Sequence, residues 1–114
     1  MKIKSLLVLL TLGMSACTGS KYAGVPKQYQ ELISQTMQTA GSNAKELKKA
    51  LKQTPTTQRE GMAFLISYMP ERDAKALTAN FLLENVDYAF KAREEFPWAK
   101  EVPNDIFLND VVAY

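Results

Sequence analysis

Residues 57–70 read TQREGMAFLISYMP and carry the clearest periodic pattern in the chain. Apolar side chains recur there at the i, i+3, i+4 and i+7 positions of one helical face: Met62, Leu65, Ile66 and Met69. Thr57 and Glu60 have the spacing of a capping box, in which each side chain bonds to the backbone N–H of the other residue. Pro70 cannot continue a helix. The stretch therefore predicts a helix that begins at Thr57, ends before Pro70 and buries one face.

The segments on both sides repeat this spacing. They carry four further apolar stripes: Tyr29, Leu32, Ile33, Met37 and Ala40; Ala44, Leu47, Ala50 and Leu51; Leu82, Leu83, Val86, Ala89 and Phe90; and Ile106, Phe107, Val111 and Val112. We expect the long helix with the third stripe to start at Asp73 or Thr78 and to run to about Glu95. No alternating strand pattern or hairpin dipeptide is present. The sequence predicts an all-α domain over residues 26–114, a small irregular bundle of about four to five helices.

Three residues inside the predicted helices are expected only where another part of the chain packs against them or pairs with them. Gly61 costs its helix roughly 1 kcal/mol relative to alanine, and close packing of another element against the backbone would explain its presence. Asn85 and Arg93 lie within or beside an apolar stripe, so their polar groups need partners. We expect those partners to be neighbouring backbone groups or a carboxylate such as Asp105.

The chain begins with the features of an export signal. These are two lysines, an apolar run and two small residues before a cysteine: Lys2, Lys4, residues 6–14 and Ser15-Ala16-Cys17. The run is about half the roughly 20 residues that a transmembrane helix needs. Small residues directly before a cysteine are typical of a bacterial lipobox, whose cysteine leads the mature chain and carries the lipid. The sequence predicts a signal peptide over residues 1–16, then a lipidated Cys17 and a flexible tether over residues 17–25.

This interpretation implies an exported protein that membrane lipid holds in the cell envelope through acylated Cys17. A periplasm-facing outer-membrane lipoprotein is the expected form. The alternative is an ordinary signal peptide that is cut elsewhere and leaves Cys17 as an incidental thiol.

The charge of the mature chain differs from that of the whole sequence. Removal of the first 16 residues from a chain of 114 leaves 98, and it takes away two of 14 basic residues against 12 acidic ones. A chain with balanced charge lacks the basic surface that nucleic-acid binding needs, so we expect no nucleic-acid partner. Four lysines still cluster on one predicted helix, Lys45, Lys48, Lys49 and Lys52. We interpret them as a solvated face, with contact to anionic lipid headgroups as the alternative.

The residue types also restrict the chemistry. The chain has one cysteine and no histidine, so thiol–imidazole and serine–histidine mechanisms lack a base. Glu94 and Glu95 are adjacent on a helix and point about 100° apart, so they do not converge on one substrate. Asn104-Asp105 and Asn109-Asp110 lack the glycine-centred pattern of a calcium loop. A serine–lysine pair stays open, although no motif points to one. We predict no enzyme activity, catalytic residue, cofactor or metal site for this chain.

A family resemblance covers roughly residues 60–114. Residues 81–93, read as FLLENVDYAFKAR, are followed by Phe96-Pro97-Trp98 and by VPNDIFLNDV at residues 102–111. This series resembles the helical segment that precedes the catalytic core in bacterial transglutaminase-like lipoproteins of the Bacteroides type. The resemblance implies a papain-like core with a Cys-His-Asp triad beyond residue 114, so no catalytic residue is carried over to this chain. It favours a truncated or split N-terminal part of such a protein, without activity of its own.

The alternative hypothesis is a complete small lipoprotein that acts as a helical interaction or adaptor module. Its partner surface would be the aromatic corner and the apolar C-terminus: Phe96, Trp98, Phe107, Val111, Val112 and Tyr114. The apolar C-terminal segment is expected either to fold back on the helices or to remain exposed as an adhesive patch.

Overall fold

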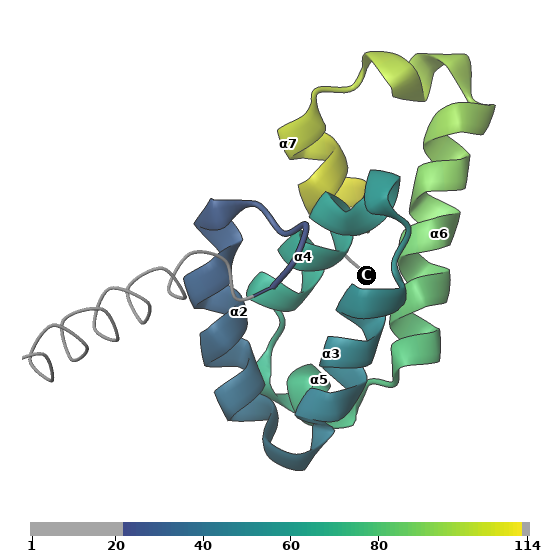
Figure 1. Ribbon diagram of the computed structural model, residues 1–114. Helices are drawn as coiled ribbons and strands as arrows, with labels where there is room; N and C mark the ends of the chain where they lie inside the picture. Colours follow the sequence, from purple (N-terminus) through teal and green to yellow (C-terminus); the bar gives the residue numbers. More distant parts are fainter. Residues whose placement is uncertain (1–21, 113–114) are drawn as a thin grey trace, which may run out of the picture.

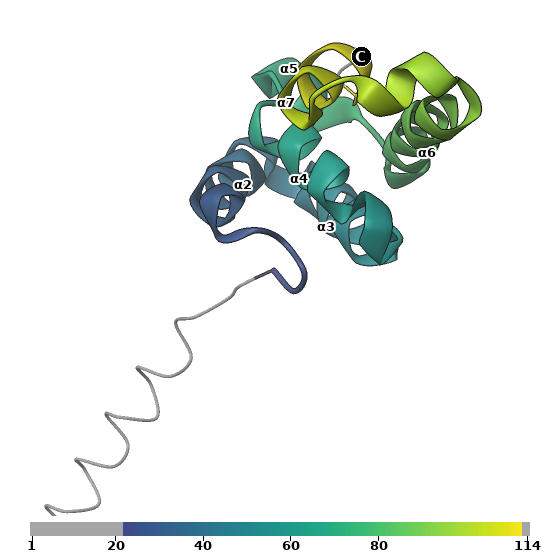
Figure 2. The same cartoon turned by 90° about the horizontal axis from the view of Figure 1, so that it is seen from above.

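The computed structural model describes residues 22–112, and within this range every regular segment is helical (Figures 1 and 2). The α-helices are α2 (Lys27–Ala40), α3 (Ala44–Gln53), α4 (Arg59–Ser67), α5 (Glu71–Ala76), α6 (Ala79–Glu95) and α7 (Asn104–Phe107). Short 3₁₀ turns lie between them, η1 (Gly41–Asn43), η2 (Thr56–Gln58) and η3 (Pro97–Glu101), and a π-helical turn, η4 (Leu108–Val112), follows α7. The predicted all-α bundle is confirmed.

Helix α4 occupies the middle of the bundle. It contacts α2, α3, α6 and η4, and Figure 1 shows it between α2 and α6. The predicted stripes supply the core, and its fully buried side chains include Ile33, Leu47, Met62, Ile66 and Leu82. The hydrophobic periodicity therefore identified the buried face of each major helix correctly.

Gly61 allows the close approach that its position suggested. A Cβ atom at Gly61 would lie 2.7 Å from Cε1 and 3.2 Å from Cζ of Phe90, and 3.7 Å from Cγ1 of Val86. Helices α4 and α6 thus meet where α4 has no side chain.

The helix ends follow the sequence in part. Gly41, with φ of 60°, follows α2, and Thr54 follows α3 in an extended conformation. Thr78 caps α6, because its hydroxyl accepts a hydrogen bond from the Phe81 N–H at 3.2 Å. Of the two predicted starts for the long helix, Thr78 is therefore correct, and Asp73 lies in the separate helix α5.

The capping box predicted at Thr57 is wrong. The Gln58 N–H donates to the Pro55 carbonyl at 2.9 Å, which closes a 3₁₀ turn around Thr57 and moves the start of α4 to Arg59. The Glu60 carboxylate instead accepts a hydrogen bond from the Asn104 amide at 3.1 Å. The local motif was overridden by the turn that Pro55 initiates.

The C-terminal segment folds back onto the bundle. Turn η4 contacts α4 and α6, and Phe107, Leu108 and Val112 are buried. The Asn85 amide donates to the Val112 carbonyl at 2.9 Å, and the Arg93 guanidinium lies 4.4 Å from the centroid of the Phe107 ring. The predicted backbone partner of Asn85 is therefore present, and Arg93 packs on an aromatic ring of the returning segment.

Arg93 also donates to the carbonyl oxygen of Val102 and to the side-chain oxygen of Asn104, both at 3.3 Å. These acceptors replace the suggested Asp105 carboxylate. Val102 lies just before α7, and Asn104 is the first residue of α7. The two hydrogen bonds therefore hold the start of α7 against α6.

Asn43 gives a first test of the packing. Its amide donates to the carbonyl oxygens of Ala74 at 2.8 Å and Leu77 at 2.9 Å, which ties η1 to the end of α5. Asn43→Ala is expected to lower the free energy of unfolding by about 1 kcal/mol, because both carbonyls lose a donor. Urea unfolding would measure the loss. The neighbouring exposed Ser42→Ala is the control, and equal losses in the two variants would contradict this role of Asn43.

Candidate functional site

The predicted partner surface is only partly exposed. Phe96 and Trp98 form a stacked pair with ring centroids 6.1 Å apart, and 47% and 67% of their surfaces are accessible. Val111 is also exposed. The assignment of Phe107 and Val112 to this surface is wrong, because both are buried: Phe107 packs against Phe90 of α6, and η4, which contains Val112, contacts α4 and α6.

Two predicted site residues cannot be placed. Cys17 and Tyr114 lie outside the described residues, so lipid attachment at Cys17 stays a prediction. Within residues 22–112, no helix is both long and apolar enough to cross a membrane.

Residues 22–25 are docked on the bundle, and the tether prediction is wrong for them. The Gln30 side chain accepts a hydrogen bond from the Tyr22 N–H and donates to the carbonyls of Tyr22 and Val25, each at 3.0 Å. Val25 is buried in the core. A side-chain amide that pairs with backbone groups removes the freedom expected of a linker.

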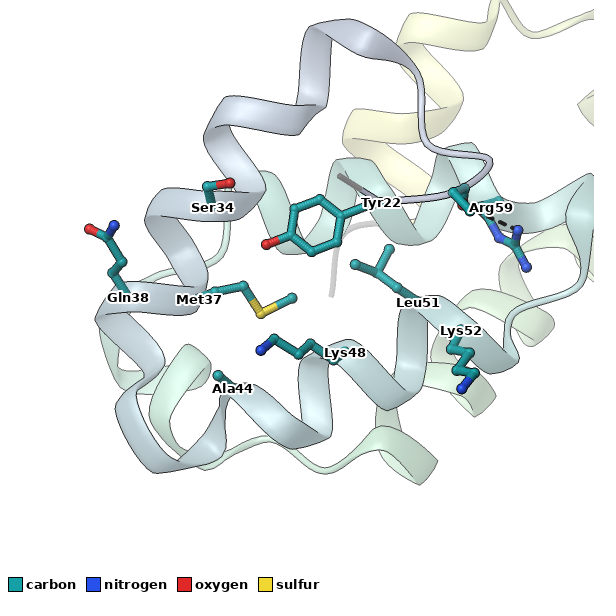
Figure 3. A pocket seen from close by; sticks show the side chains of 10 residues that line it. Tyr22, Ser34, Met37, Gln38, Ala44, Lys48, Leu51, Lys52 and Arg59 are labelled. Carbon is teal, nitrogen blue, oxygen red and sulfur yellow. Dashed lines mark hydrogen bonds between the residues drawn. The ribbon is translucent and has the colours of Figure 1, made fainter. Parts of the chain in front are cut away.

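A cavity of about 650 Å³ opens beside this docked segment (Figure 3). It lies between α2, α3 and the start of α4. Figure 3 shows the Tyr22 ring between α2 and α3, with Met37 and Leu51 pointing toward it. The middle of the cavity is therefore aromatic and aliphatic.

Cationic side chains line the ends of the cavity. Lys48 extends toward Met37, and Lys52 and Arg59 lie at the other end (Figure 3). No aspartate or glutamate belongs to the part of the lining that the structure describes. The cavity thus combines an apolar middle with an excess of positive charge.

Arg59 is held in place by backbone groups. Its Nη2 donates to the Thr54 carbonyl at 2.8 Å and its Nη1 to the Ala23 carbonyl at 3.4 Å, whereas its buried Nε has no hydrogen-bond partner within the described part of the chain. Gly24, with φ of 76°, lies so close that a Cβ atom there would be 2.5 Å from Nη1. The docked segment therefore covers part of the guanidinium group without neutralising it.

The predicted lysine face of α3 continues outward from the cavity. Lys45, Lys48, Lys49 and Lys52 are all exposed. Glu46 lies elsewhere on the helix, where its carboxylate accepts a hydrogen bond from the Ala79 N–H at 2.9 Å. This contact uses the acidic residue of α3 to hold the start of α6 and leaves the lysine face uniformly basic.

The groups with shifted pKa values lie elsewhere. Burial raises the pKa of Tyr29, a core phenol that packs edge-on against Phe64. A hydrogen bond from Lys91, whose ammonium is 2.9 Å from the carboxylate, lowers the pKa of the partly exposed Asp87. Among residues 22–112, no three His, Cys, Asp or Glu side chains are grouped to hold a metal ion. These groups with shifted pKa values, Tyr29 and Asp87, do not converge on a site where a substrate would react.

Comparisons with known proteins found no matching protein-family model, no matching curated protein and no matching solved structure. The transglutaminase-like resemblance therefore remains a prediction.

Proposed function

We propose that this chain is a lipid-anchored helical adaptor of the bacterial cell envelope, without catalytic activity of its own. Membrane lipid holds it through acylated Cys17, and a protein partner binds the exposed pair Phe96 and Trp98. The observation that carries the proposal is the separation of these two ends. Figure 2 shows turn η3, which contains Trp98, and the start of the described chain on opposite sides of the molecule.

The exposed pair has the composition of a binding hot spot. Large aromatic side chains concentrate binding energy at protein interfaces, and Phe96 and Trp98 are already stacked on each other. A partner would bury both rings with little loss of side-chain freedom, because the stacking restricts them before binding.

The anchor is tested by metabolic labelling with a fatty-acid probe. The wild-type chain is expected to incorporate the label and to sediment with membranes, whereas Cys17→Ala is expected to lose the label, because no other cysteine is present. Unchanged labelling of the variant would contradict the lipobox interpretation.

The partner surface is tested by photo-crosslinking in cells with a photoreactive amino acid at position 98. A discrete adduct is expected at position 98 and is expected to weaken with Phe96→Ala. Position 68 is the matched control, since Tyr68 is an aromatic residue of similar exposure on another part of the bundle. No adduct, or the same adducts from both positions, would contradict the adaptor role.

A second proposal follows from the returning C-terminal segment, which exposes Ile106 and Val111 beside the buried Phe107. These two apolar side chains are suited to contact a following domain, in line with the truncated or split transglutaminase-like protein. The genomic sequence after codon 114 tests it. A reading frame with a cysteine followed by histidine and aspartate would support this origin, and its absence in all frames would contradict it.

A further inference from the structure

We infer that the cavity between α2 and α3 binds an anionic membrane lipid. The charged headgroup is held at the end of the cavity that Lys52 and Arg59 line, and an acyl chain lies over Leu51 and Met37 toward Lys48. The chemistry of the cavity does not depend on the proposed function, whereas the membrane as the source of the lipid rests on the proposed anchor.

The first support is charge that the protein leaves unbalanced. Within residues 22–112, none of the three cations forms an ion pair with a carboxylate. Residues 1–21 contain no aspartate or glutamate, so that part of the sequence cannot supply one. An anion from outside the chain would therefore meet a site without a competing carboxylate.

The state of Arg59 indicates where that anion binds. A guanidinium group pairs most favourably with a carboxylate or phosphate through parallel N–H donors. Among residues 22–112, the group donates to the carbonyls of Ala23 and Thr54, and its buried Nε has no partner. The two carbonyl contacts fix the position of the guanidinium and leave its full charge available to a headgroup.

The second support is the shape and lining of the cavity. Its volume of about 650 Å³ falls within the roughly 300–1,000 Å³ of small-molecule sites. Tyr22, Met37 and Leu51 offer an apolar surface between the cations, and the unbranched methionine adapts to a flexible chain. A free phosphate ion would leave this surface uncovered, whereas a lipid with an anionic head and an apolar tail matches both parts.

The third support is position. Cys17 precedes Tyr22 by five residues, and five extended residues reach at most about 18 Å. An acyl group on Cys17 would therefore hold the mouth of the cavity close to the bilayer surface. The adjacent lysine face of α3 would then lie near anionic headgroups, which attract basic surfaces at short range.

Native mass spectrometry tests the inference. The full chain is released from non-ionic detergent micelles that contain equal amounts of phosphatidylglycerol and phosphatidylcholine. One bound phosphatidylglycerol is expected, with inorganic phosphate unable to displace it. No retained lipid, equal retention of both lipids, or displacement by phosphate alone would overturn the inference.

Two double variants of equal charge locate the site. Lys48→Gln with Lys52→Gln is expected to reduce the bound fraction about tenfold, because it removes the headgroup contact of Lys52 and the positive charge of Lys48 at the other end of the cavity. Lys45→Gln with Lys49→Gln removes the same charge from the same helix outside the cavity and is expected to leave binding unchanged. Equal reductions would show non-specific attraction to the lysine face and would overturn the inference. All four lysines are exposed, so folding is expected to be retained.

Cys17→Ala separates this inference from the anchor. The bound lipid is expected to persist in this variant, even if labelling shows that Cys17 carries no lipid. Binding that appears only in Cys17→Ala would mean that the chain's own acyl group fills the cavity, which would overturn the inference while the anchor stands.

Discussion

Phe107→Ala is expected to lower the free energy of unfolding by about 3–5 kcal/mol, the usual loss for a large aromatic side chain removed from a core. Only 1% of the surface of Phe107 is accessible. Its ring packs edge-on against Phe90 with centroids 5.0 Å apart, and Arg93 covers one face. The substitution therefore removes apolar contacts and a cation–π contact together, and urea unfolding monitored by circular dichroism would measure the loss.

Ile106→Ala is the matched control. Ile106 precedes Phe107 in the same helix, but 45% of its surface is accessible. Its replacement is expected to change stability by no more than about 0.5 kcal/mol, as at other surface positions. Equal losses at the two positions would mean that α7 does not pack in the orientation seen here.

Gly61→Val is expected to lower the free energy of unfolding by about 2–3 kcal/mol through overpacking. The added Cβ atom would be 2.7 Å from the Phe90 ring, and that ring cannot move freely because it packs against Phe107. The better helix propensity of a residue with a side chain recovers only about 0.5 kcal/mol of this loss. Thermal and urea unfolding would report the effect.

A second substitution tests whether the ring causes the loss. Phe90→Leu destabilises the wild-type core but makes room beside residue 61, so it should cost less in the Gly61→Val background. A double-mutant cycle measures this coupling. Strictly additive effects would contradict direct contact between the two positions.

The helical core could be predicted from the sequence because the spacing of apolar residues within each helix is enough to identify its buried face. The i, i+3, i+4 spacing in residues 57–70 and its repeats place each stripe on one face, and the structure buries those faces. The start at Thr78 depends on one capping residue and was one of the two predicted starts of the long helix. Thr57 failed as a cap because the 3₁₀ turn after Pro55 takes its place.

The candidate site could be predicted only in fragments. The lysine pattern on α3 was visible, but the cavity depends on Tyr22 and Arg59, which come together over 37 positions of sequence. The C-terminal segment was ambiguous for a different reason. Both pairs, Ile106 with Val111 and Phe107 with Val112, are apolar and five residues apart, so periodicity alone could not tell the exposed pair from the buried one.

The docked segment at residues 22–25 has a consequence for how strongly the cavity must bind. With a lipid on Cys17, only five sequence positions separate the anchor from Tyr22 in the docked segment. Short linkers raise the local concentration of a tethered partner to about the millimolar range. An affinity for lipid that would be too weak to matter in a freely diffusing protein would then be enough to fill the cavity. A change of a few residues in linker length would alter the fraction of cavities that hold a lipid without altering any contact.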